Sequence, residues 1–211
     1  MRRAILLLPL AFSPVYAMGF WGSVGGGLNI GGFGEVRFTE DGDTVIVKTS
    51  PKGFIAGMNL MGGVSLQPIP IAVGLGVDYY AGTQRYKFGG IWARYALDTF
   101  EVNRTYINLP VAYQLSLPML KGYFGIYPAY ALYSVKGKGE SDWAVFKGFA
   151  FGGFTNLYYS LGPVGLGGGI FFDYGPSFKG RSKPGNTDVY INNVFHYGIN
   201  LGLLVSLGVL E

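Results

Sequence analysis

The chain has 211 residues, enough for one domain with a substantial core, and it contains 36 glycines and no cysteine. Hydrophobic residues make up 49% and charged residues only 13%, about half the charged share of an ordinary soluble protein, and the formal net charge is +4. This composition argues against a soluble surface, against a helical bundle, in which each glycine costs roughly 1 kcal/mol, and against a disulfide framework.

The first segment has the pattern of an export signal. Arg2 and Arg3 precede an apolar run over Ala4–Phe12, and Val15 and Ala17 occupy the two positions that a signal peptidase reads. The apolar run is too short for the alternative, a membrane anchor. We therefore predict a signal peptide over residues 1–17 and a single mature domain over residues 18–211.

The rest of the chain alternates, residue by residue, between apolar side chains and small or polar ones. A period of two indicates extended strands. In chain order, the alternating segments are Phe20–Phe38, Phe54–Gln67, Ile71–Gln84, Tyr106–Leu117, Phe124–Tyr133, Phe149–Ser160, Val164–Phe178 and Phe195–Val209. Each has room for the ~9–11 residues with which a tilted strand crosses a bilayer.

The connections between these segments are alternately short and long. The short ones are proline-containing turns at Gln67–Pro70, Leu117–Gly122 and Leu161–Gly165. The long ones are polar and cover Thr39–Gly53, Arg85–Arg104, Lys136–Lys147 and Lys179–Asp188. Short turns at one end and long loops at the other are typical of bacterial outer-membrane barrels, in which the short turns are periplasmic.

The two sides of each strand indicate what surrounds the barrel. Every second residue of a strand points to the same side, and we call such a set of alternate residues a file. In Val164–Phe178 one file is apolar throughout, whereas the other is mostly glycine with Asp173 in its middle. A soluble barrel would carry many Lys and Glu side chains on its outward file, and neither file here does. We therefore expect the apolar file to face lipid and the file of small, polar residues to line a narrow lumen. An open sheet edge cannot remain in hydrocarbon. We therefore predict an all-β, antiparallel, up-and-down β-barrel of about eight strands that spans the bacterial outer membrane.

The signal peptide, the alternating strands, the proline turns and the basic long loops resemble the small outer-membrane barrels of the OmpA transmembrane-domain type. The resemblance covers the whole mature chain and rests on pattern. It implies a structural outer-membrane protein whose lumen is plugged by polar side chains, with some members leaking ions. The peptidoglycan-binding domain of longer members is expected to be absent.

The inward file carries the candidate site. We predict a polar lumen network made of Glu35, Arg37, Asn59, Asp78, Asn108, Asp173, His196 and Asn200. Buried charges need partners, so the network is expected to form a hydrogen-bonded plug. A narrow passive channel is the first alternative. The second is a lipid-modifying enzyme built on Ser177, His196 and Asp173, which is disfavoured because these residues are expected to point inward, away from lipid.

The long loops are net basic, apart from the acidic Thr39–Thr44 stretch. We predict that seven cations contact the phosphates of outer-membrane lipid and lipopolysaccharide: Arg85, Lys87, Arg94, Arg104, Lys179, Arg181 and Lys183. No metal, cofactor or nucleic acid is expected, a surface partner is left unidentified, and the protein is expected to be a monomer. The expected role is thus structural and non-enzymatic.

Overall fold

The computed structural model describes residues 17–40, 43–67, 69–89, 97–137, 144–181 and 188–207. Apart from Ala17, with which the first strand begins, the predicted signal peptide lies outside these residues and stays a prediction. In the described part of the chain, no helix is long and apolar enough to cross a membrane.

The described residues form ten strands in one antiparallel sheet. They are β1 (Ala17–Glu40), β2 (Asp43–Lys52), β3 (Phe54–Gln67), β4 (Ile71–Gly89), β5 (Leu97–Asn108), β6 (Val111–Leu117), β7 (Leu120–Gly137), β8 (Ala144–Leu161), β9 (Val164–Arg181) and β10 (Asp188–Leu207). β2 and β3 both lie between β1 and β4, and β5 and β6 both lie between β4 and β7. The ten strands therefore occupy the eight barrel positions that the sequence predicts.

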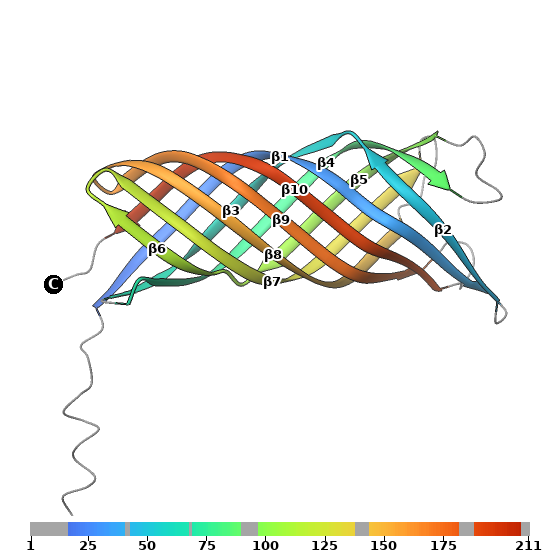
Figure 1. Cartoon of the computed structure of the whole chain (residues 1–211), viewed down its shortest axis with the longest axis horizontal. Coiled ribbons are helices and arrows are strands. Elements are labelled where there is room, and N and C mark those ends of the chain that lie inside the picture. The colour runs from blue at the N-terminus through green and yellow to red at the C-terminus, as the bar shows by residue number, and fades with distance from the viewer. Residues whose placement is uncertain are drawn as a thin grey trace, which may run out of the picture.

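The sheet closes on itself. β1 pairs with β10 from Phe20, opposite Leu207, to Thr39, opposite Asp188. The strands cross the barrel at a steep tilt, and the first residues of β1 lie at the same end as the last residues of β10 (Figure 1). This end also carries the turns that join β3 to β4, β6 to β7 and β8 to β9, so it is the periplasmic end of the predicted topology.

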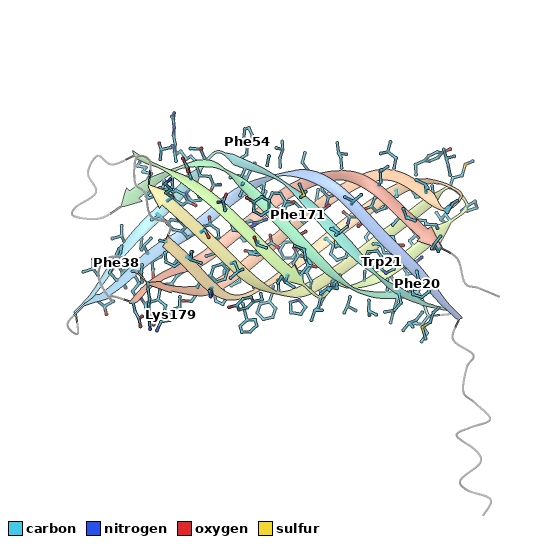
Figure 2. All side chains as sticks on the ribbon, turned by 180° about the vertical axis from the view of Figure 1, so that it is seen from behind. Phe20, Trp21, Phe38, Phe54, Phe171 and Lys179 are labelled. Carbon is cyan, nitrogen blue, oxygen red and sulfur yellow. The ribbon has the colours of Figure 1, made fainter. Side chains whose placement is uncertain are left out.

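The polarity is that of a membrane barrel. Large apolar side chains are exposed on the outer surface, including Phe20, Phe38 and Phe54, whereas Trp21 and Phe171 are buried inside (Figure 2). Exposed aromatic side chains, the kind that forms interfacial girdles in outer-membrane barrels, include Phe20, Phe38, Phe54, Tyr79, Phe124, Tyr159, Phe172, Tyr174, Phe195 and Tyr197. The predicted arrangement, with apolar residues outside and polar residues inside, is confirmed.

The strands extend further toward the outer end than predicted. Most of the expected loop Thr39–Gly53 is a hairpin of β1 and β2, which continues past β3 at the outer end (Figure 1). Val45, Ile46 and Val47 explain this extension because β-branched side chains fit a pleated sheet well. β4 and β5 likewise shorten the predicted loop Arg85–Arg104 from both sides.

The wall is irregular where β2 meets β3. β1 pairs with β3 up to Ile30 and with β2 from Glu35, so residues 31–34 have no ladder partner in either described strand. Gly31 has a φ of 124°, in the region that favours glycine. Side chains compensate for the missing ladder: Gln84 Nε2 donates to the Gly31 carbonyl at 2.8 Å, and Thr49 Oγ1 donates to the Phe33 carbonyl.

Candidate functional site

The middle of the lumen is filled by side chains from five strands, β4, β5, β7, β9 and β10. Each points inward because it belongs to the file that alternates with the lipid-facing residues of its strand. We call these side chains the central cluster: Asp78, Tyr80, Arg104, Tyr106, Asn108, Tyr127, Asp173 and His196.

Arg104 is the centre of this cluster, which corrects the prediction that it contacts lipid from a loop. It lies in β5 on the same file as Tyr106, and only 1% of its side chain is exposed. Its Nη1 lies 3.4 Å from Asp173 Oδ2, and its guanidinium carbon is 4.6 Å from the ring centroids of both Tyr80 and Tyr106. An ion pair and two cation–π contacts thus compensate the buried charge.

Asp173 joins Arg104 to β7. The Tyr127 hydroxyl donates to Asp173 Oδ1, so the carboxylate has a cation on one oxygen and a hydroxyl on the other. The Tyr127 ring occupies the space in which Gly152 of β8 would carry a Cβ. The glycine therefore has a packing role: it lets the tyrosine lie flat against the wall and reach the carboxylate.

A second carboxylate, Asp78, lies beside this pair. Asn108 Nδ2 donates to Asp78 Oδ2 at 2.6 Å. A cavity of about 10 Å³ adjoins it, with Asn59 and Asn200 in its lining, which leaves room for about one water molecule. Asn59 and Asn200 are both buried, so three of the predicted polar residues, Asn59, Asp78 and Asn200, line this cavity, and Asn108 is bonded to one of them.

His196 is fully buried beside the ion pair. Its Nδ1 lies 3.5 Å from the Tyr106 hydroxyl, and its ring stacks on Tyr133 at 5.8 Å. Asp173 is its ladder partner on β9. The sequence pattern suggests a position nearer the outer rim for His196, whereas the structure places it within the central cluster.

An aromatic layer lies next to His196 inside the barrel, and sequence reasoning missed most of it. Phe33 stacks on Tyr86 at 4.2 Å, and the Tyr86 hydroxyl lies 3.0 Å from that of Tyr133. Phe178, expected on the lipid face, is fully buried and packs near Tyr133 at 6.4 Å. The alternation between inward and outward residues shifts by one position here, which we call the phase change. Gly175 and Phe178 both point inward, and Ser177 between them is exposed.

The phase change bears on the proposed catalytic set. Ser177 is exposed on the outside of the barrel, whereas Asp173 and His196 are buried inside it. The three side chains cannot form a hydrogen-bonded chain, so they do not make a nucleophilic triad. Among the described residues, no group of three His, Cys, Asp or Glu side chains is placed to hold a metal ion.

The remaining predicted residues that the structure describes lie near the outer end. Glu35 accepts a hydrogen bond from Asn192 Nδ2 at 2.9 Å, but Arg37 is 45% exposed, so it belongs to the surface and not to the lumen. The correction has a simple cause: β1 continues beyond the closed part of the barrel. Arg85, Lys87, Lys179 and Arg181 are exposed, while Arg94 and Lys183 lie outside the described residues.

The fold is shared with solved outer-membrane proteins. OprG from Pseudomonas aeruginosa matches with a TM-score of 0.61 and 12% identity, covering 91% of this chain and 97% of that one. A major outer membrane protein from Thermus thermophilus matches at 0.52 and 15% identity, covering 90% and 99%. Neisserial surface protein A matches at 0.51 and 15% identity, covering 88% and 96%. No protein-family model and no curated protein matches the sequence. The chain is therefore a small β-barrel of the bacterial outer membrane.

Proposed function

We propose that the chain is a structural outer-membrane protein of the OmpA transmembrane-domain type, which supports the integrity of the membrane without enzyme chemistry. The filled lumen carries this proposal. Arg104, Asp173 and the tyrosines around them occupy the middle of the barrel, and the cavity beside Asp78 is only about 10 Å³. A plug of this kind lets a barrel cross the membrane without making it leaky.

Contact with lipopolysaccharide is part of the proposed role. Exposed cations lie toward the outer end of the barrel on β2 and β4, among them Lys52, Arg85 and Lys87. Basic side chains at this level suit the phosphates of the outer leaflet. A monomer suffices, because the described strands close into one sheet through the pairing of β1 with β10, so that no edge strand needs a second copy to cover it.

Deleting the gene in its own host tests the proposal. We expect cells without the protein to become sensitive to detergent and to large antibiotics that an intact outer membrane excludes, and the wild-type gene to restore the barrier. An unchanged barrier combined with slower uptake of small hydrophilic solutes would instead identify the protein as a passive channel.

A further inference from the structure

Three cations gather on the outer surface where β2 meets β4. Lys52 lies directly opposite Arg85 in the ladder, and Lys87 follows on the same face two residues later. None of the carboxylates whose side chains the structure describes forms an ion pair with these cations. Like charges opposite each other in a sheet repel, so the arrangement favours an anion that binds between them.

An apolar groove of about 800 Å³ begins next to this cation cluster. Phe54 follows Lys52 by two residues on the same outward file, is 61% exposed, and lines the start of the groove. Successive ladder partners form one wall of the groove: Phe54, Ile30, Tyr197, Phe172, Gly153 and Ile126. The opposite wall, from Leu28 to Phe124, follows the same strands two residues closer to the periplasmic end.

The groove descends along the barrel. It starts at Phe54, the first residue of β3, and ends on β7 at Phe124 and Ile126, in the part of the strand that follows the periplasmic turn between Leu117 and Leu120. Figure 2 shows Phe54 on the outside of the barrel, at a distance from the girdle residue Phe20 at the other end. The groove therefore leads from the headgroup level into the hydrocarbon, and its volume is in the range of ~300–1,000 Å³ that is typical of ligand pockets.

We propose that the cation cluster and the groove form a binding site for one lipid A moiety of lipopolysaccharide, with its phosphates between Lys52, Arg85 and Lys87 and an acyl chain in the groove. This deepens the lipid contact of the proposed function and rests on it. Charge decides between the lipids: each phosphate monoester of lipid A carries about −1.5 to −2 charges, which complements three clustered cations. The single phosphodiester of a phospholipid carries only one negative charge and therefore complements three clustered cations less well.

Lipid binding to the purified barrel in neutral detergent tests the site, with native mass spectrometry as the readout. The probes are bisphosphorylated lipid A, dephosphorylated lipid A and phosphatidylglycerol. We expect one lipid A to remain bound to the wild type, and the other two lipids to bind at least about tenfold more weakly. The variant Lys52→Gln/Arg85→Gln should lose at least about tenfold in lipid A affinity, because it removes two charge-assisted contacts.

Two further variants make the test specific. Lys147→Gln/Arg181→Gln removes the same charge from exposed sites on β8 and β9, away from the groove, and should change the affinity less than about twofold. Thr155→Trp adds an apolar ring to the groove wall without changing charge and should weaken lipid A binding. Equal losses in the two double variants, or equal binding of lipid A and phosphatidylglycerol, would overturn the site. Neither result would bear on the closed lumen or on the barrier defect, which test the proposed function separately.

Discussion

The buried ion pair of Arg104 and Asp173 is the costliest feature of the lumen. Removing two charges from water is compensated only where the partners are well placed. Here the Asp173 carboxylate and two tyrosine rings surround the guanidinium, and the Tyr127 hydroxyl donates to the carboxylate. Among the described residues, Arg104 Nε and Nη1 still lack a hydrogen-bond partner, although Nη1 is within ion-pair distance of Asp173. The pair is thus sensitive to the loss of either member.

We predict that Arg104→Met lowers the free energy of unfolding by about 3–5 kcal/mol, because it leaves Asp173 as an unpaired buried charge. Adding Asp173→Leu should recover part of this loss, since two apolar side chains replace both charges. Urea unfolding of the barrel in lipid vesicles measures the difference. As a control, Lys179→Met breaks the exposed pair with Asp188 and should leave the midpoint nearly unchanged. A double variant less stable than the single one would contradict this view of the pair.

Gly152 provides a second test at this scale. We predict that Gly152→Ala destabilises the barrel by about 1–3 kcal/mol, because the new methyl group meets the buried Tyr127 ring and displaces its hydroxyl from Asp173. Gly22→Ala is the matched control: the nearest atom to its added Cβ is the Met61 carbonyl oxygen at 3.7 Å, an ordinary contact. Equal unfolding midpoints for the two variants would mean that the ring moves freely.

Arg104 also shows what a sequence can and cannot predict about single residues. Its charge suggests a loop, yet it shares a period-two file with Tyr106 and Asn108, and that signal is present in the sequence. The position of Arg104 between two tyrosine rings cannot be predicted from the sequence, because Tyr80 belongs to another strand and the contact depends on the register between the strands.

At the level of elements, periodicity predicts the eight crossings because a two-residue repeat persists wherever one face meets lipid. The ends are less predictable, since above the bilayer the outward file becomes polar and the contrast between the faces disappears. This explains why β2 falls in a predicted loop although Val45–Val47 favour a strand. It also explains Phe178, because the phase change between Gly175 and Phe178 involves backbone geometry that alternation does not encode.

The junction of β1 with β2 and β3 gives a prediction for a single element. Gln84→Leu removes the donor to the Gly31 carbonyl, where β1 has no ladder partner in β2 or β3 as the structure describes them. We expect faster amide hydrogen exchange confined to residues 30–34 and 49–53, because an unsatisfied backbone group favours local opening. Gln114→Leu, which removes an exposed bond to Ser116, is the control. Unchanged exchange in β1 would show that the amide of Gln84 does not hold this junction.

At the scale of the whole molecule, the described residues combine a closed hydrogen-bonded ladder, an apolar exterior and an interior of packed polar and aromatic side chains. Closure leaves no edge to fray in hydrocarbon, and stability therefore comes from the backbone ladder in a chain that has no cysteine.

We expect this ladder to survive mild detergent. The unheated barrel should migrate on a cold detergent gel at a position different from that of the boiled chain, because only the unfolded chain binds detergent along its whole length. Circular dichroism of the two samples identifies which is folded. Identical mobility of both samples, with strand signal lost before boiling, would contradict a barrel held by its ladder.

The central claim is that side chains seal the lumen, and single-channel recording tests it most directly. The purified wild-type barrel is inserted into a planar bilayer, with a general porin in the same bilayer as the positive control. We predict no current steps above background at moderate voltage, because Arg104, Asp173 and the tyrosines around them fill the path. Reproducible, ohmic steps from the folded wild-type protein would contradict the sealed lumen and the structural role proposed from it.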